Sequence, residues 1–85
     1  MDKHADPLVV MGVDPGLSVT GYGVVVSSGN SFKALSFGAI CPPKSSSREQ
    51  KLRLIYEELL SVVEDFNPDI VAIEDFIAGH VRAAV

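Results

Sequence analysis

Hydrophobic positions near the start of the chain fall into short runs that are bounded by glycine, proline, asparagine or serine. The first run, LVVMGVD at 8–14, is apolar up to its final aspartate. A Val-rich run of this length is typical of a strand buried on both faces. Two further runs, at 20–28 and 31–41, follow after short turns. We therefore predict three strands joined as an antiparallel meander.

The spacing changes to that of a helix over 48–66, where apolar residues recur every three or four positions. Ser47 is the expected N-cap, and Asn67-Pro68 is expected to end the helix. A strand is predicted at 69–75. The order strand, long helix, strand implies a right-handed crossover that places 69–75 parallel to 8–14. The helical apolar positions are Leu52, Ile55, Tyr56, Leu59, Val62, Val63 and Phe66.

The two ends of the chain differ from this pattern. We expect residues 1–7 to form a mobile leader and residues 8–85 to form one unit. The final residues, GHVRAAV, have no cap and no glycine stop, and we interpret them as a helix cut in its first turns, with Asp75 near its N-terminus. These features predict a truncated α/β domain.

Composition narrows the class of protein. The chain has 85 residues, of which 47% are hydrophobic, so it is typical of a globular domain rather than a disordered one. It contains neither an apolar run long enough to span a bilayer nor a signal-peptide pattern. Its one cysteine, Cys41, suits a reducing compartment, so we expect a cytoplasmic protein with no membrane association. The net charge of −4 argues against a free-standing nucleic-acid binder.

Two carboxylates stand at the ends of apolar strands. Asp14 follows Gly12 by two residues, and Glu74 follows Ala72 by two residues, so each shares a strand face with a small residue. If the crossover makes the strands parallel neighbours, Asp14 and Glu74 end level with each other. Two such anions repel unless a proton or a cation lies between them. Oxygen ligands without a His or Cys partner favour Mg²⁺ or Mn²⁺.

The residues of these two strands also carry a family resemblance. GVDPGLSVTGYGVV followed by PDIVAIEDF resembles the N-terminal half of the RuvC-type Holliday junction resolvases, which are RNase H-like endonucleases. The resemblance covers residues 9–80. It implies an RNase H-like fold and a hydrolase that resolves four-way DNA junctions in recombination and repair. Asp14 and Glu74 match the first two of four acidic ligands, and the other two come from a later helix.

The same resemblance implies cofactors and partners. A complete site would hold two Mg²⁺ ions, with Mn²⁺ as a substitute, and the full-length form would be a homodimer on junction DNA. Junction-binding and branch-migration proteins are further partners that it implies. The chain departs from the family after the glutamate, because the usual aromatic position is Ile77 and the aromatic, Phe76, comes one place earlier. His80 and Arg82 match the family's DNA-contacting segment only loosely.

Two other classes of function stay open at this point. Actin-like and sugar-kinase-like ATPases also have a D-x-G loop between two strands, and a non-catalytic remnant would need no site at all. With two of four ligands, the 85 residues alone are expected to be inactive. Near Asp14, we expect Ser18 and Thr20 to stabilise the turn. We expect another element to pack closely against Gly21 and Gly23, the alternative being that they leave room for a phosphate beside Asp14.

Overall fold

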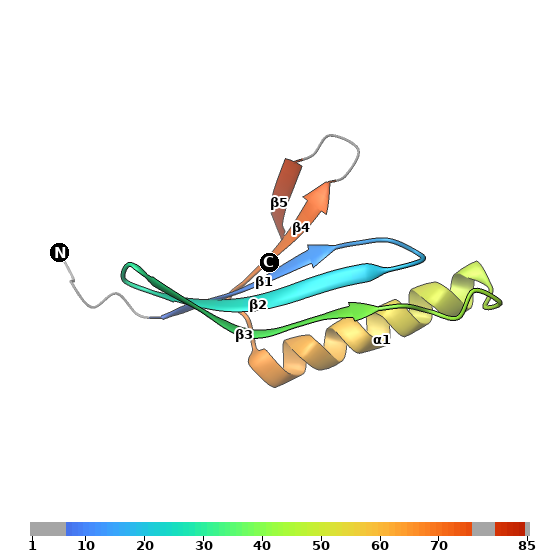
Figure 1. The fold of residues 1–85 in the computed structure, drawn as a ribbon, viewed down its shortest axis with the longest axis horizontal. Coiled ribbons are helices and arrows are strands. Elements are labelled where there is room, and N and C mark those ends of the chain that lie inside the picture. The colour runs from blue at the N-terminus through green and yellow to red at the C-terminus, as the bar shows by residue number, and fades with distance from the viewer. Residues whose placement is uncertain (1–6, 76–79, 85) are drawn as a thin grey trace.

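A computed structural model describes residues 7–75 together with the backbone of residues 80–84. Five strands form one sheet in the order β3-β2-β1-β4-β5, with a single helix among the described residues (Figure 1). The predicted meander, helix and fourth strand are confirmed. The elements are β1 (Leu8–Asp14), β2 (Thr20–Ser28), β3 (Ser31–Ile40), α1 (Arg48–Phe66), β4 (Ile70–Asp75) and β5 (His80–Ala84).

Strand register sets which residues share a face of the sheet. β1 and β2 are antiparallel, with Gly12 opposite Gly23 and Asp14 opposite Gly21. β1 and β4 are parallel, with Gly12 opposite Ala72. Because side chains alternate along each strand, these partners point to the same side of the sheet. The parallel pairing confirms the predicted crossover.

Helix α1 begins and ends at the residues that the sequence predicts. The hydroxyl of Ser47 accepts a hydrogen bond from the Gln50 N–H at 3.1 Å, and the Gln50 side chain accepts one from the Ser47 N–H at 2.9 Å. This capping box satisfies two backbone donors at the first turn. Asn67 ends the helix in the left-handed conformation, with φ of 46°, and donates its N–H to the Val63 carbonyl.

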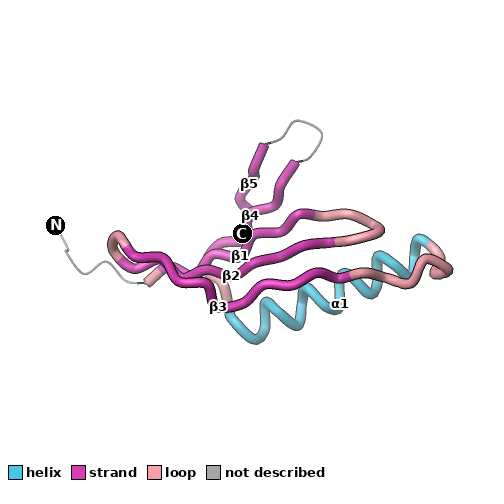
Figure 2. The backbone as a smooth tube through the Cα atoms, viewed as in Figure 1, coloured by secondary structure: helices cyan, strands magenta, loops and turns pink. Residues whose placement is uncertain are grey.

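The helix packs on one face of the sheet only (Figure 2). Met11, Val13 and Val24 form the buried cluster of the strands, and the second half of α1 packs against it. Leu52 and Tyr56, nearer the start of α1, remain exposed even though they fall on the predicted apolar spacing. The α1 side chains that contact the cluster are Leu59, Val62, Val63 and Phe66.

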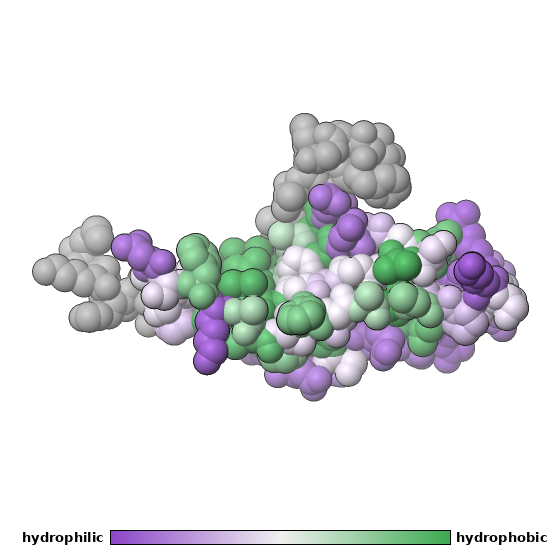
Figure 3. All heavy atoms as spheres, viewed as in Figure 1, coloured by the Kyte–Doolittle hydropathy of each residue, from purple (hydrophilic) through white to green (hydrophobic). Residues whose placement is uncertain are grey.

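We call the opposite side of the sheet the open face, because no element among the described residues covers it. It carries the even-numbered residues of β1 and their partners in β2 and β4. Figure 3 looks onto it and shows hydrophobic side chains over the strands. Phe32 and Phe37 on the edge strand β3 are 75% and 82% exposed. A register shift between Val24 and Val25 brings these two phenylalanines, five residues apart, to this same face.

The prediction for the end of the chain is wrong. Residues 80–84 form strand β5, which pairs antiparallel with β4, and Asp75 is the last residue of β4 rather than the start of a helix. The unpaired backbone edge of β4 offers hydrogen bonds that outweigh the weak helical preference of so short a segment. The expected leader at 1–7 lies outside the described residues, except for Pro7. In the described part of the chain, no helix is both long and apolar enough to cross a membrane.

Candidate metal centre

Asp14 ends strand β1 at the rim of the open face. Its backbone is still paired with Gly21 of β2, and Pro15, which cannot donate to a ladder, follows at once. The side chain is exposed rather than packed in the core. The Asp14 carboxylate is therefore exposed to solvent, while its backbone is held by pairing within the sheet.

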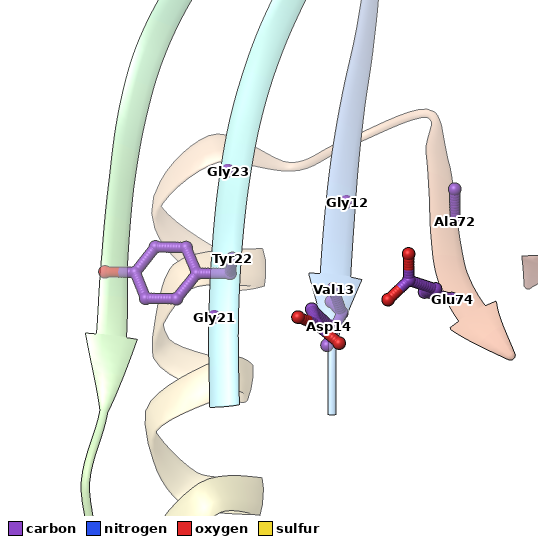
Figure 4. Close-up of a pocket in the computed structure, with 8 residues that line it drawn as sticks. All are labelled: Gly12, Val13, Asp14, Gly21, Tyr22, Gly23, Ala72 and Glu74. Carbon is purple, nitrogen blue, oxygen red and sulfur yellow. The ribbon is translucent and has the colours of Figure 1, made fainter. Parts of the chain in front are cut away.

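Glu74 lies level with Asp14 on the neighbouring strand. The parallel ladder runs from the pair of Val10 and Ile70 to the pair of Val13 and Ile73, so the next residue of each strand is a carboxylate. Figure 4 shows the Glu74 side chain extending from β4 toward β1, on the side of Asp14. The structure thus brings together the two residues that the sequence predicts as a pair.

The two carboxylates interact electrostatically. Hydrogen bonding with Asp14, and then its negative charge, raise the pKa of Glu74 above the usual value for glutamate. Both side chains are exposed, so desolvation is only the smallest of the three causes. A shared proton or a bound cation would relieve the repulsion between them.

An open pocket of about 320 Å³ lies beside the pair (Figure 4). Glycines form much of the floor of this pocket. The space above them is empty, since a Cβ added at Gly12 or Gly23 would meet nothing within 4 Å. At Gly21 the only neighbour would be the Asp14 Cβ, at 4.0 Å. The expected close packing against Gly21 and Gly23 is therefore not met by any described element. The lining residues are Gly12, Val13, Asp14, Gly21, Tyr22, Gly23, Ala72 and Glu74.

The turn after Asp14 is held by a buried hydroxyl. Thr20 accepts a hydrogen bond from the Gly16 N–H at 3.1 Å and donates one to the Gly16 carbonyl at 2.7 Å. The prediction that Thr20 stabilises the turn is confirmed. At Gly16 a Cβ would lie 2.5 Å from the Val19 carbonyl oxygen, so the turn has room only for glycine.

Asp69 fixes the register that aligns the pair, and the sequence analysis missed it. Its carboxylate accepts the Val9 N–H at 2.8 Å, and its own N–H donates to the Val9 carbonyl at 2.8 Å. These two bonds join the start of β4 to β1. The available signal was an aspartate directly after Asn67-Pro68, where a side chain often bonds to backbone.

The donor set fits part of a site for a hard divalent cation. Two carboxylates that face one pocket are the ligands that Mg²⁺ and Mn²⁺ prefer. Within the described residues, no group of three or more His, Cys, Asp and Glu is placed to hold a metal ion. Phe76 and Ile77 lie outside the described residues, and His80 and Arg82 are described only as backbone of β5.

Comparison with known proteins agrees with this architecture. The profile of the family described as "Crossover junction endodeoxyribonuclease RuvC" matches residues 10–85. The RuvC of Alkaliphilus oremlandii is 40% identical over 79 residues, which are 92% of this chain and 48% of that protein. The RuvC of Trichlorobacter lovleyi is 42% identical over 77 residues, which are 89% of this chain and 43% of that protein.

Solved structures show the same fold. The structure of Thermus thermophilus RuvC matches with a TM-score of 0.75 and 28% identity, covering 80% of this chain and 43% of that one. T. thermophilus RuvC in complex with a Holliday junction substrate matches with a TM-score of 0.75 and 29% identity, covering 80% and 42%. This chain therefore spans a little under half the length of these relatives. From the profile match and the shared fold, it belongs to the RuvC family of crossover junction endodeoxyribonucleases.

Proposed function

We propose that this chain is the N-terminal part of a metal-dependent endonuclease that resolves four-way DNA junctions. The observation that carries the proposal is the placement of Asp14 and Glu74, level on adjacent parallel strands beside an open, glycine-floored pocket. Membership of the RuvC family supports the substrate class, since a relative of the same fold has been solved on a Holliday junction substrate.

In this proposal Asp14 and Glu74 hold the divalent cation, Mg²⁺ or Mn²⁺, at the rim of the open face. A pair of such ions, held by these residues and further ligands, would supply an activated water and a positive charge at the leaving oxygen for phosphodiester hydrolysis. The carboxylates act as fixed oxygen ligands, and the raised pKa of Glu74 means that a proton competes for the same position at low pH. Binding of the cation should therefore weaken as the pH falls.

The pocket floor gives the DNA backbone room to approach the carboxylates. Gly12 and Gly23 present no side chain, and a Cβ at either position would stand free on the open face. Glycine in a strand interior normally costs stability, about 0.5–1 kcal/mol relative to alanine. No described residue fills the space above Gly12 and Gly23. In the proposed function, glycine is present at these positions because a substrate phosphate occupies that space.

Two carboxylates are half of the ligand set that the family resemblance implies. Mg²⁺ requires near-octahedral oxygen coordination, so this pair alone should hold at most one ion, and weakly. We therefore expect these 85 residues by themselves to be inactive on DNA. Because acidic residues outnumber basic ones and the net charge is −4, we expect most basic contacts to the DNA backbone to come from the rest of the proposed full-length protein.

The remaining partners follow from the same proposal. A junction with two-fold symmetry is matched by a homodimer, and junction-binding and branch-migration proteins would act on the same DNA. The single cysteine, Cys41, is exposed and free, which suits the reducing cytoplasm. The ATPase alternative gains no support, since the matching family is one of nucleases.

A chimera tests the proposed function. Residues 8–75 would replace the matching segment of the RuvC of Alkaliphilus oremlandii, which is 40% identical. We expect the chimera to cut a four-way junction with Mg²⁺. Asp14→Asn and Glu74→Gln should each abolish cleavage while sparing junction binding, because backbone contacts are made by other residues.

Glu64→Gln is the matched control, since Glu64 is an exposed carboxylate on α1 outside the pocket. It should leave cleavage unchanged. If the Asp14→Asn chimera still cut the junction at the rate of its parent, Asp14 would have no part in the reaction and the proposal would be wrong.

A further inference from the structure

Among the residues whose burial the structure describes, Thr20 is the one buried polar residue, and both hydrogen bonds of its hydroxyl are made to Gly16. The residue is 1% exposed at the start of β2. Its hydroxyl accepts the Gly16 N–H and donates to the Gly16 carbonyl, so both backbone polar groups of Gly16 are satisfied by one side chain.

The hydrogen bonds of Gly16 also limit the conformation of Asp14, because only Pro15 separates the two residues. Pro15 has its φ fixed near −65°, and a residue before proline is held to extended conformations. Asp14 therefore has little backbone freedom once Gly16 is fixed. Gly16 is held by its two hydrogen bonds to Thr20, and no larger residue fits there, because an added Cβ would lie 2.5 Å from the Val19 carbonyl oxygen.

The ladder alone does not hold Asp14 on both sides. Its backbone pairs with Gly21 of β2, but the parallel pairing with β4 ends one residue earlier, at Val13 and Ile73. The residues that follow Asp14 belong to the turn and to no strand. The hydroxyl of Thr20 thus supplies the hydrogen bonds that hold the turn directly after the end of β1.

We infer that Thr20 is a positioning residue for the metal centre: its hydroxyl locks the Asp14–Gly16 turn and so keeps the Asp14 carboxylate level with Glu74. The inference rests on the proposed function, because the aligned pair matters only if it holds a cation. Residues that orient metal ligands without touching the metal typically change affinity by about 10- to 100-fold when they are replaced.

Three variants separate this role from a general effect on folding. Thr20→Val keeps the shape of the side chain and removes the hydroxyl, whereas Thr20→Ser keeps the hydroxyl and removes the methyl group. Val24→Ala is the matched control, since Val24 is a fully buried residue of the same strand that makes no contact with Gly16 through a polar group. It should destabilise the fold and leave the turn intact.

The measurement is Mn²⁺-induced broadening of the backbone amide signals of the ¹⁵N-labelled chain, at a temperature where every variant is folded. In the wild type we expect broadening centred on Asp14 and Glu74. Thr20→Val should require about 10- to 100-fold more Mn²⁺ for the same broadening and should exchange the Gly16 amide hydrogen faster. Thr20→Ser and Val24→Ala should titrate like the wild type.

Each result decides a different question. If Thr20→Val bound Mn²⁺ as tightly as the wild type, the positioning role would be overturned and the proposed function would stand. If Val24→Ala lost Mn²⁺ as severely as Thr20→Val, the effect would be one of stability, and the positioning role would again be overturned. If the wild type showed no broadening near Asp14 and Glu74, these residues would form no cation site in this chain and the inference would be overturned, whereas the proposed function is decided separately by cleavage in the chimera.

Discussion

Replacement of Val24 by alanine tests whether the fold is stabilised from one side of the sheet. Val24 is 0% exposed and packs with Met11 and Val13 beneath the second half of α1. The substitution removes the equivalent of two methylene groups, worth about 0.8 kcal/mol each on transfer from water. A residual cavity under the helix raises the expected loss to about 2–3 kcal/mol.

The neighbouring valine provides the control for this experiment. Val25 points to the open face, where no described element covers it, and it is only half-buried. Val25→Ala loses the same intrinsic strand preference but little packing, so we expect a loss below about 1 kcal/mol. The difference between the two variants isolates the contribution of the helix-covered core.

Urea denaturation followed by circular dichroism measures both losses. Domains are typically stable by about 0.05–0.15 kcal/mol per residue, which for 85 residues is about 4–13 kcal/mol. The loss at Val24 is therefore a large share of the total, and its unfolding midpoint should fall clearly below that of Val25→Ala. Equal losses for the two variants would refute a core that lies on one face.

Two further results are expected. Asp14→Asn should lower the pKa of Glu74 toward its usual value, measured by ¹³C NMR of the side-chain carboxyl, because the hydrogen bond and charge that raise it are changed. Because the pKa of Glu74 is raised in the folded state, its interaction with Asp14 stabilises the fold at low pH, and this stabilisation is lost as the pH rises through that pKa. The Asp14→Asn variant should lack this pH dependence of stability. An unchanged pKa of Glu74 in the variant would contradict the pairing. Ser47→Ala should cost about 1 kcal/mol of unfolding free energy by removing the cap of α1, whereas a loss within error would show that the capping box contributes nothing.

The sequence predicts the parts of this fold that local pattern controls. Strand β1, its turn and strand β2 follow from apolar runs and from Asp14-Pro15-Gly16, and α1 follows from its spacing and from Ser47. The alignment of Asp14 with Glu74 could also be predicted, since the crossover rule fixes the direction of β4. These features depend on residues near one another in the chain or on a general rule of connection.

The features that were missed depend on contacts across the sheet. β5 forms because β4 offers a free edge, which the local sequence of residues 80–84 does not reveal. The pairing of Asp69 with Val9 joins residues 60 positions apart, and no periodicity marks it. The exposure of Leu52 and Tyr56 likewise reflects which part of α1 lies over the core cluster rather than their spacing.

The most direct test of the central claim is a count of bound Mn²⁺ by electron paramagnetic resonance. The claim is that Asp14 and Glu74 form one cation site on the open face. We expect the wild-type chain and the Glu64→Gln control to bind one Mn²⁺ weakly, and Asp14→Asn and Glu74→Gln each to lose it, because a single carboxylate cannot compete with water for the ion. If either site variant bound Mn²⁺ as the wild type does, the paired carboxylates would not be the metal centre.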